Sequence, residues 1–293
     1  MQSVEISIII PNYNNKKYLA DCLDSVLRQS FKNFEIIVTD DGSTDGSIEL
    51  IGHYAGRYPE RIRAIFHKKN LGISRNRHRG IVASHGKYIT TLDSDDMYDD
   101  IQKLEREYGL IKQYEANKGQ DVIAFSNVRM LFNDGTYQVV GNTKNIREGD
   151  IFQSMLMRSC FIPRDFLFKR EMYFGVGGYD PRYRIYEDWN FKLKLARCCP
   201  FYYTGVNGII YRRHGQGLSS YGADVHLKYL RKSFSEEIFR IKDVEAIKDY
   251  KIRFEKMLED SLNNEYRKET YFRKLAFRLK CAIHERARDR NRH

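Results

Sequence analysis

The amino-acid sequence predicts an α/β fold in which a mostly parallel sheet is flanked by helices. Its first half alternates short apolar runs with segments of helical periodicity, an alternation typical of strands joined by crossover helices. The first run, Val4–Ile10, is almost continuously apolar, as expected for a strand covered on both faces. From about Tyr221 the pattern is helical, charged and nearly free of proline, which predicts a helical C-terminal extension.

The expected elements follow one another in a regular order. The first helix is expected at Lys16–Gln29, where four apolar residues share one face. Further strands are expected at Phe34–Thr39, Ile62–Phe66, Tyr88–Leu92 and Val122–Phe125. Further helices are expected at Thr44–Arg57, Ser74–Ser84 and about Ile101–Ala116. A hairpin is expected to turn at Asn133-Asp134-Gly135, because Asp-Gly favours tight turns between strands.

Charge and composition narrow the class of protein. The 293 residues carry a formal net charge of +11, and 42% of them are hydrophobic, enough for a sizeable core. The last 27 residues hold ten Lys/Arg against three acids, a balance of +7 that leaves +4 for the rest. The basicity therefore belongs mainly to the tail, and no nucleic-acid partner is expected.

Cysteine usage and hydropathy predict the compartment. The five cysteines are odd in number and lack metal-ligand spacing, which favours a reducing cytoplasm over a disulfide framework or a zinc site. The N-terminal run is too short for a signal peptide, and no run approaches the roughly 20 apolar residues of a membrane span. We expect a cytoplasmic protein, or at most a peripheral one at the inner face of the plasma membrane.

Polar clusters follow three of the predicted strands. They are Pro11-Asn12-Tyr13-Asn14, Asp40-Asp41-Gly42-Ser43 and Asp93-Ser94-Asp95-Asp96. The carboxyl ends of parallel strands meet at one edge of a sheet, and ligands of open α/β sheets bind there. The sequence therefore predicts that the three clusters form one site.

The last cluster gathers three carboxylates within four positions. Like charges this close repel one another and raise each other's pKa, so a folded protein rarely gathers them without a cation. Oxygen ligands suit Mg²⁺ or Mn²⁺, and Mg²⁺ usually shares its coordination with substrate phosphates. The alternative is a solvated acidic helix start, since Asp is favoured at N-caps and in first turns.

The motifs together resemble an inverting family 2 glycosyltransferase with the Rossmann-like GT-A fold. The matching segments are Ser7–Asn14, Ile37–Asp45, Asn70–Ser74, Leu92–Asp96, Gly177–Asp180 and Glu187–Trp189. The match runs from about Val4 to Ser220, which predicts a GT-A domain at 1–220 and a helical, basic extension at 221–293. The resemblance implies transfer of a sugar from a nucleotide-sugar donor, with a UDP-sugar expected, to a hydroxyl of a glycan or lipid-linked acceptor in bacterial surface polysaccharide synthesis.

The resemblance also implies which residues bind the nucleotide. Pro11 and Tyr13 would frame the base, and Asp41 would accept a hydrogen bond from the uracil N–H, because a carboxylate only accepts. The alternative for the second cluster is that Asp40 or Asp41 caps the next helix. Arg77, in a segment similar to the family's Asn-x-Gly…Arg-Asn-x-Gly element, would reach a phosphate or orient the acidic loops. A solvated basic helix face is the other interpretation of that segment.

For the metal, the resemblance implies that Asp95 of the Asp-x-Asp motif binds Mn²⁺ or Mg²⁺ at the donor diphosphate. Asp93 would contact the ribose or a metal-bound water, and Asp96 would support the site or cap the following helix. His214 would add a nitrogen ligand, although a lone His is more often no ligand. Arg212 and Arg213 would pair with diphosphate oxygens.

For the acceptor side, the resemblance implies that Asp188 is the general base. An inverting transfer needs a group that takes the proton of the attacking hydroxyl. Glu187 would support it or bind the acceptor, and Trp189 would line the acceptor subsite or pack in the core. The alternative for the acidic pair is a first helical turn that complements the helix dipole.

Two other functions remain open at this point. Acids at strand ends with a divalent cation also serve nucleotidyltransferases and phosphotransferases, yet the usual Gly-rich phosphate loop is absent from this sequence. A catalytically silent sugar-nucleotide-binding module would be expected to lose the base or a metal acid, whereas Asp93, Asp95 and Asp188 are all retained.

The C-terminal tail predicts a basic amphipathic helix. Its apolar face comprises Phe272, Leu275, Ala276, Leu279 and Ile283. Such a helix can lie on an anionic membrane surface. The alternative is packing on its own domain or on a second subunit in a homodimer, with long basic stems covering apolar surface.

We expect a deletion of the residues after Tyr266 to abolish co-sedimentation with anionic liposomes at low salt, because it removes the charge balance of +7 and the apolar face together. Neutral liposomes provide the control. Unchanged co-sedimentation of the shortened chain would rule out the tail as a membrane anchor.

Overall fold

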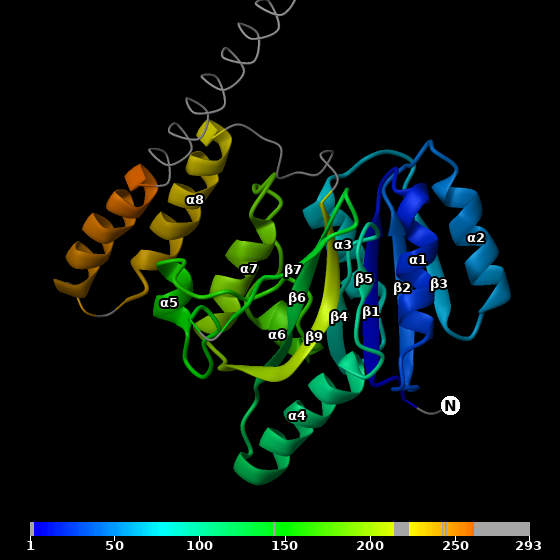
Figure 1. Cartoon of the computed structure of the whole chain (residues 1–293), viewed down its shortest axis with the longest axis horizontal. Helices are drawn as coiled ribbons and strands as arrows, with labels where there is room; N and C mark the ends of the chain where they lie inside the picture. The colour runs from blue at the N-terminus through cyan, green and yellow to red at the C-terminus, as the bar shows by residue number, and fades with distance from the viewer. Residues whose placement is uncertain (1–2, 143, 214–222, 242, 244, 261–293) are drawn as a thin grey trace, which may run out of the picture.

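The computed structural model describes residues 3–142, 144–213, 223–241, 243 and 245–260. Within them, helices flank two β-sheets (Figure 1). The strands are β1 Ile6–Asn12, β2 Phe34–Asp40, β3 Ile62–Phe66, β4 Tyr88–Thr91, β5 Met97–Tyr98, β6 Ile123–Phe132, β7 Tyr137–Val139, β8 Phe168–Lys169 and β9 Phe201–Arg213. The helices are α1 Lys16–Leu27, α2 Ser47–Arg57, α3 Ile73–Ala83, α4 Lys103–Lys118, α5 Phe152–Leu156, α6 Arg170–Gly175, α7 Glu187–Ala196 and α8 Ala223–Ile238.

The first sheet has the order β3-β2-β1-β4-β8. Its first four strands run parallel, and only β8 is antiparallel. The prediction of a mostly parallel sheet flanked by helices is therefore confirmed. Each predicted strand and helix of the first 118 residues is present, with ends shifted by a few residues.

The second sheet has the order β5-β9-β6-β7 and was only partly expected. The hairpin of β6 and β7 is confirmed, and Gly135 takes the positive φ of 82° that its turn requires. The long strand β9 was not predicted, because Gly205, Asn207 and Gly208 interrupt its apolar pattern. It pairs in parallel with β6 and antiparallel with β5.

The continuous apolar run of β1 follows from burial on both faces. Ile8 and Ile10 point into one hydrophobic cluster with residues of α1, α2 and α4. Ile9 points to the opposite face, into a second cluster with Ile81 of α3 and residues of α7. Because all three isoleucines are fully buried, the period-2 alternation of a half-exposed strand is absent.

The helices after β9 pack against the rest of the chain. Phe234 of α8 stacks on Phe254 of a further helix at 245–260, with ring centroids 3.8 Å apart. Both rings belong to the same hydrophobic cluster as Ile9. The predicted boundary between the GT-A domain and the extension, at residue 220, stays a prediction because 214–222 lie outside the described residues. The predicted tail helix also lies outside them. Among the helices that are described, none combines the length and apolar character needed to cross a bilayer.

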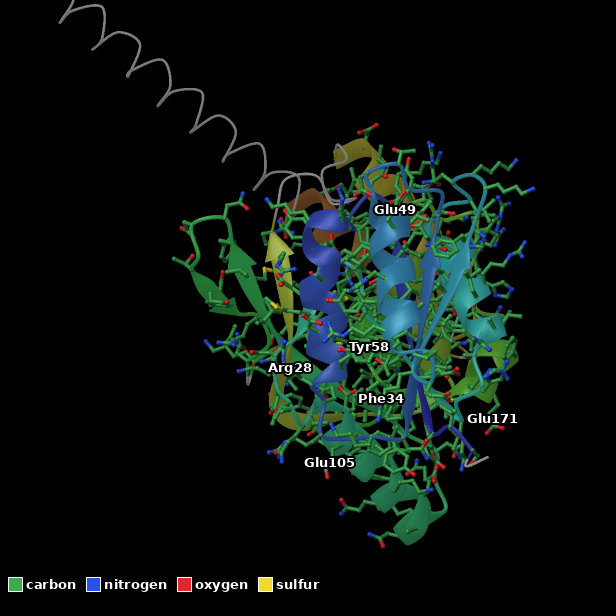
Figure 2. The ribbon with its side chains drawn as sticks, turned by 90° about the vertical axis from the view of Figure 1, so that its right-hand side faces the viewer. Arg28, Phe34, Glu49, Tyr58, Glu105 and Glu171 are labelled. Atoms are coloured by element: carbon green, nitrogen blue, oxygen red, sulfur yellow. The ribbon has the colours of Figure 1, made fainter. Side chains whose placement is uncertain are left out.

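A surface cavity of about 400 Å³ lies at the carboxyl ends of α1 and α2. Arg28 and Tyr58 line it, and Figure 2 shows both beside the ends of these two helices. Because α1 and α2 run antiparallel to the strands, this end of the molecule is opposite to the carboxyl edge of the first sheet. The cavity is therefore separate from the polar clusters of that edge.

Close packing of α3 on the sheet depends on Gly80. A Cβ at this position would lie 2.5 Å from Cγ2 of Ile9 and 3.1 Å from Cγ2 of Thr39. We expect Gly80→Ala to lower the free energy of unfolding by about 1–3 kcal/mol, because α3 must move off the sheet. Chemical denaturation measures the effect.

Gly109 of α4 is the matched control, because a Cβ there meets nothing within 4 Å. Gly109→Ala should stabilise the protein by about 0.5–1 kcal/mol through helix propensity. Equal effects of the two substitutions would contradict the packing argument.

Candidate active site

The three polar clusters meet at the carboxyl edge of the first sheet. Asn12, at the end of β1, donates from Nδ2 to Oδ2 of Asp40 at 2.7 Å. Asn15 donates from Nδ2 to Oγ of Ser94 at 3.0 Å. These bonds join the ends of β1, β2 and β4, so the structure brings together the segments that the sequence predicted to converge.

Asp40 and Asp41, at the end of β2, hold two loops in place through hydrogen bonds to backbone N–H groups. Asp40 accepts bonds from the backbone N–H groups of Gly42 and Ser43 and so shapes its own turn. The carboxylate of Asp41 accepts the backbone N–H groups of Leu71 and Gly72 at 2.8 and 2.9 Å. Neither acid caps α2; this end of the helix is bound instead by Asp45, which accepts the N–H of Ser47.

Pro11, Tyr13 and Asp41, the residues predicted to frame a nucleotide base, lie near the carboxyl ends of β1 and β2. Pro11 is buried in β1, whereas Tyr13 is 48% exposed at the edge. Each oxygen of Asp41 accepts one backbone bond and has a second lone pair. The role of these residues toward a nucleotide base stays a prediction.

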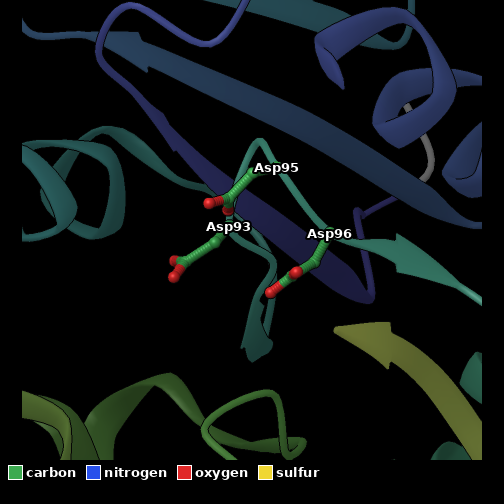
Figure 3. Close-up of side chains that lie close together, drawn as sticks. All are labelled: Asp93, Asp95 and Asp96. Carbon is green, nitrogen blue, oxygen red and sulfur yellow. The ribbon is translucent and has the colours of Figure 1, made fainter. Parts of the chain in front are cut away.

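The acidic run forms a tight turn between β4 and β5. The N–H of Asp96 donates to the carbonyl oxygen of Asp93 at 3.0 Å. One carboxylate oxygen from each of Asp93, Asp95 and Asp96 lies within 4.8 Å of the other two, and Figure 3 shows the three side chains on one turn. Because the next helix, α4, begins at Lys103, the run is not an acidic helix start. Three oxygen ligands at this spacing fit a divalent cation such as Mn²⁺ or Mg²⁺.

Arg164 neutralises this turn and was missed by the sequence analysis. Its Nη1 lies 3.0 Å from Oδ2 of Asp93, and its Nη2 contacts Oδ2 of Asp96. The ring of Tyr211 stacks on the guanidinium at 4.5 Å, and the Tyr211 hydroxyl accepts the backbone N–H of Arg164. No pattern in the sequence marks this arginine, because it lies in an irregular segment between α5 and β8.

The acids of the turn differ in their pKa values. Burial favours the protonated form of Asp93 and of Asp96. For Asp93, Arg164 and Arg77 outweigh burial and hold the pKa below its ordinary value. For Asp96, burial dominates over Arg164, and the neighbouring Asp95 and Asp93 raise its pKa further, well above the ordinary value.

Arg77 connects the acidic turn to Glu187, the residue directly before the predicted base. This side chain is 2% exposed, and its Nη2 lies 2.5 Å from Oδ1 of Asp93. Its Nη1 contacts Oε1 of Glu187. Of the two roles considered for Arg77, the geometry accounts for the orientation of the acidic loops, and a phosphate contact stays a prediction.

The acidic pair begins α7. Tyr186 precedes it with a positive φ of 63°, which turns the chain into the helix. Glu187 is buried, and burial raises its pKa despite the opposing charge of Arg77. Asp188 is 29% exposed, and its Oδ2 lies 3.1 Å from Nζ of Lys192. Burial opposes ionisation of Asp188, but Lys192 and Arg77 together lower its pKa to about 2.

Strand β9 brings Arg212 to the acidic turn. Because Met97 pairs with Ile210, the next residues of β9 lie beside Asp95 and Asp96. The N–H of Arg212 donates to Oδ1 of Asp96 at 3.0 Å, and its side chain binds the carbonyl oxygen of Asp95 and the carboxylate of Asp21.

The remaining predicted residues are placed less centrally. Arg213 is exposed at the end of β9, and His214 lies outside the described residues. Trp189 is half-buried against the core cluster, and the cations of Lys192 and Arg158 both lie over its ring.

These features define an α/β protein whose ligand site lies at the carboxyl edge of its sheet. The model of the family described as Glycosyl transferase family 2 matches residues 7–173, more than half of the chain. The chain belongs to this family, as its motifs predicted.

Curated relatives agree with this assignment. An uncharacterized glycosyltransferase of Nostoc sp. is 26% identical over 294 residues, covering 94% of this chain and 85% of the relative. The PGL/p-HBAD biosynthesis glycosyltransferase of Mycobacterium bovis is 27% identical over 197 residues, covering 66% of this chain and 70% of the relative. An uncharacterized protein of Mycobacterium tuberculosis is 26% identical over 216 residues, covering 73% of this chain, and the chain spans 60% of its length.

Solved structures confirm the fold. S. aureus TarS 1–349 in complex with UDP-GlcNAc superposes with a TM-score of 0.66 at 19% identity, covering 84% of this chain and 69% of that one. The complex of the same protein with UDP gives a TM-score of 0.61 at 18% identity, covering 84% of this chain and 68% of that one. The predicted GT-A fold is therefore present.

We expect Arg164→Met to lower the free energy of unfolding by about 3–5 kcal/mol at neutral pH, because Asp93, whose pKa Arg164 helps to hold low, loses that cation. A carboxylate whose pKa is lowered by folding stabilises the protein above its unfolded pKa and loses this contribution in acid. The difference from the wild-type protein should therefore shrink as the pH falls below about 4.

Arg231→Met is the matched control, since Arg231 forms an exposed ion pair with Glu255. It should change the free energy of unfolding by less than about 1 kcal/mol. Denaturant titrations across pH measure both variants, and a loss for Arg164→Met that does not depend on pH would contradict the electrostatic account.

Proposed function

We propose that this protein is a metal-dependent, inverting glycosyltransferase that moves a sugar from a nucleotide-sugar donor to a hydroxyl of a glycan or lipid-linked acceptor in bacterial surface polysaccharide synthesis. One observation carries the proposal. Arg77 bridges Asp93 of the acidic turn and Glu187 of the acidic pair. The acidic turn, which suits a donor diphosphate, and the start of α7, where Asp188 follows Glu187, are therefore joined by one buried cation.

The donor side is supported by the acidic turn and by the structural relatives. Asp93, Asp95 and Asp96 would hold Mn²⁺ or Mg²⁺, and His214 would add a ligand. When bound, such a cation supplies Lewis-acid stabilisation of the leaving diphosphate. The UDP and UDP-GlcNAc complexes of TarS favour a UDP-sugar as donor. Arg212 and Arg213 are the proposed diphosphate partners.

The acceptor side is supported by the state of Asp188. Its low pKa keeps the carboxylate ionised at neutral pH and ready to take a proton, although Lys192 makes it a weak base. A bound diphosphate would add negative charge nearby and raise the basicity of Asp188. In the proposed step the acceptor oxygen loses its proton to Asp188 and attacks the anomeric carbon. The bond to the diphosphate oxygen then breaks, its electron pair leaves with the diphosphate, and the anomeric carbon is inverted.

Glu187 has a separate role in this scheme. It is buried, bound to Arg77 and directly before the base, so it fixes the start of α7. Membrane contact through the tail and pairing with a second subunit are proposals from the sequence alone.

A panel of nucleotide sugars with Mn²⁺ tests the function, with release of free nucleoside diphosphate and isothermal titration of UDP as readouts. Asp188→Asn should keep UDP binding and reduce transfer by about 10²-fold or more, because the general base is lost. Asp95→Ala should lose the metal dependence of UDP binding.

Asp134→Asn is the matched control, because Asp134 lies exposed in the turn of the β6–β7 hairpin. Normal transfer by Asp188→Asn would show that the base is misassigned. Absence of nucleoside diphosphate with every donor would favour a nucleotidyltransferase, a phosphotransferase or a silent binding module.

A further inference from the structure

Backbone strain is concentrated beside the acidic pair. Three non-glycine residues of the described chain have positive φ: Asn14, Arg158 and Tyr186. Asn tolerates this conformation, whereas Arg and Tyr adopt it rarely, and such strain gathers at functional sites. Arg158 and Tyr186, with φ of 51° and 63°, also contact one another. Two strained positions therefore meet directly before Glu187.

The guanidinium of Arg158 lies on an aromatic surface. Its Cζ is 4.7 Å from the centroid of the Trp189 ring and 5.4 Å from that of Tyr186. The side chain is exposed, and no carboxylate of the described residues pairs with it. The rings thus orient a planar cation without using its N–H donors.

Both rings are themselves held in place. The Tyr186 hydroxyl is hydrogen-bonded to Nδ1 of His226 in α8 at 3.1 Å. Trp189 packs against the core cluster, and Nζ of Lys192 lies 5.1 Å from its ring. Helices α5, α7 and α8 contact one another here and lie side by side in Figure 1. The aromatic surface is therefore held by a hydrogen bond from α8 and by packing against the core cluster.

This surface adjoins the proposed base. Lys192, which contacts the Trp189 ring, also binds the carboxylate of Asp188 at 3.1 Å. Arg77 lies between Glu187, directly before the proposed base, and Asp93 of the acidic turn. Arg158 is thus placed on the acceptor side of the site, and the donor diphosphate has its own cations in Arg212 and Arg213.

On the basis of the proposed function, we propose that Arg158, supported by Tyr186 and Trp189, binds an anionic oxygen group of the acceptor, a phosphate or a carboxylate. A planar guanidinium presents paired N–H donors that match both groups, which a lysine cannot reproduce. The substrate class is then an acceptor that carries negative charge close to the hydroxyl that is glycosylated. The competing account is that Arg158 only covers the aromatic rings with its aliphatic stem.

Binding of small probes to the full chain with UDP and Mn²⁺ tests the proposal. Glycerol 3-phosphate and methyl β-glucuronide carry the two anionic groups, and glycerol and methyl β-glucoside are their neutral counterparts. Titration followed by ligand-observed NMR gives the affinities. We expect at least one anionic probe to bind the wild-type protein about tenfold or more tightly than its neutral counterpart. The two arms distinguish a phosphate from a carboxylate.

Variants assign this preference to the guanidinium. Arg158→Met keeps an apolar stem over the rings and should abolish the preference, and Arg158→Lys should restore only a minor part of it. Arg57→Met is the matched control, because Arg57 is an exposed arginine that lies over the ring of Tyr58, away from the site. It should keep the full preference.

Two results would overturn the inference while UDP binds normally: equal affinities for anionic and neutral probes, or a preference that survives Arg158→Met. Failure of UDP and Mn²⁺ to bind the wild-type protein would instead overturn the proposed function on which the inference rests. UDP binding is measured separately by calorimetry, so the two failures are distinguishable.

Discussion

The bridge from Arg77 to Asp93 and Glu187 is the interaction on which the rest of the site depends. It joins the carboxyl edge of the parallel sheet to the first turn of α7, two parts of the chain that are far apart in sequence. A buried guanidinium is costly to desolvate, and only paired carboxylates offset that cost. Removal of either acid would leave the arginine partly uncompensated, so sheet edge and helix start are positioned together.

Around this bridge the site balances its own charges. Arg164 spans Asp93 and Asp96, Arg212 contacts the turn through backbone and side chain, and Lys192 pairs with Asp188. The acids can therefore stay close together in the folded chain before any cation arrives. A divalent ion that enters this turn is repelled by the positive charges of Arg164 and Arg212. Because a diphosphate brings negative charge that offsets this repulsion, we expect the ion to enter together with the diphosphate.

Sequence patterns predicted the parallel strands of the first sheet well, because β1, β2 and β4 are buried along their whole length and α1 has a clear apolar side. They also predicted that the three polar clusters meet, because parallel strands joined by crossover helices all end at the same edge of the sheet. They missed β9, whose Gly205 and Gly208 break the apolar pattern, and Arg164, which no periodicity or motif marks. His214 and the tail helix lie outside the described residues, so those predictions stay open.

The pairing of β9 with two other strands constrains the number of residues in β9 more than their identity. Strand β9 pairs with β6 from Phe201 to Arg213 and with β5 at Ile210, so every residue near its end has a fixed place along the ladder. Inserting or deleting one residue in the regular ladder between Ile209 and Arg212 would reverse the faces of the residues that follow and carry Arg212 away from the acidic turn. The number of residues between Ile209 and Arg212 therefore decides which side chain of β9 reaches the acidic turn.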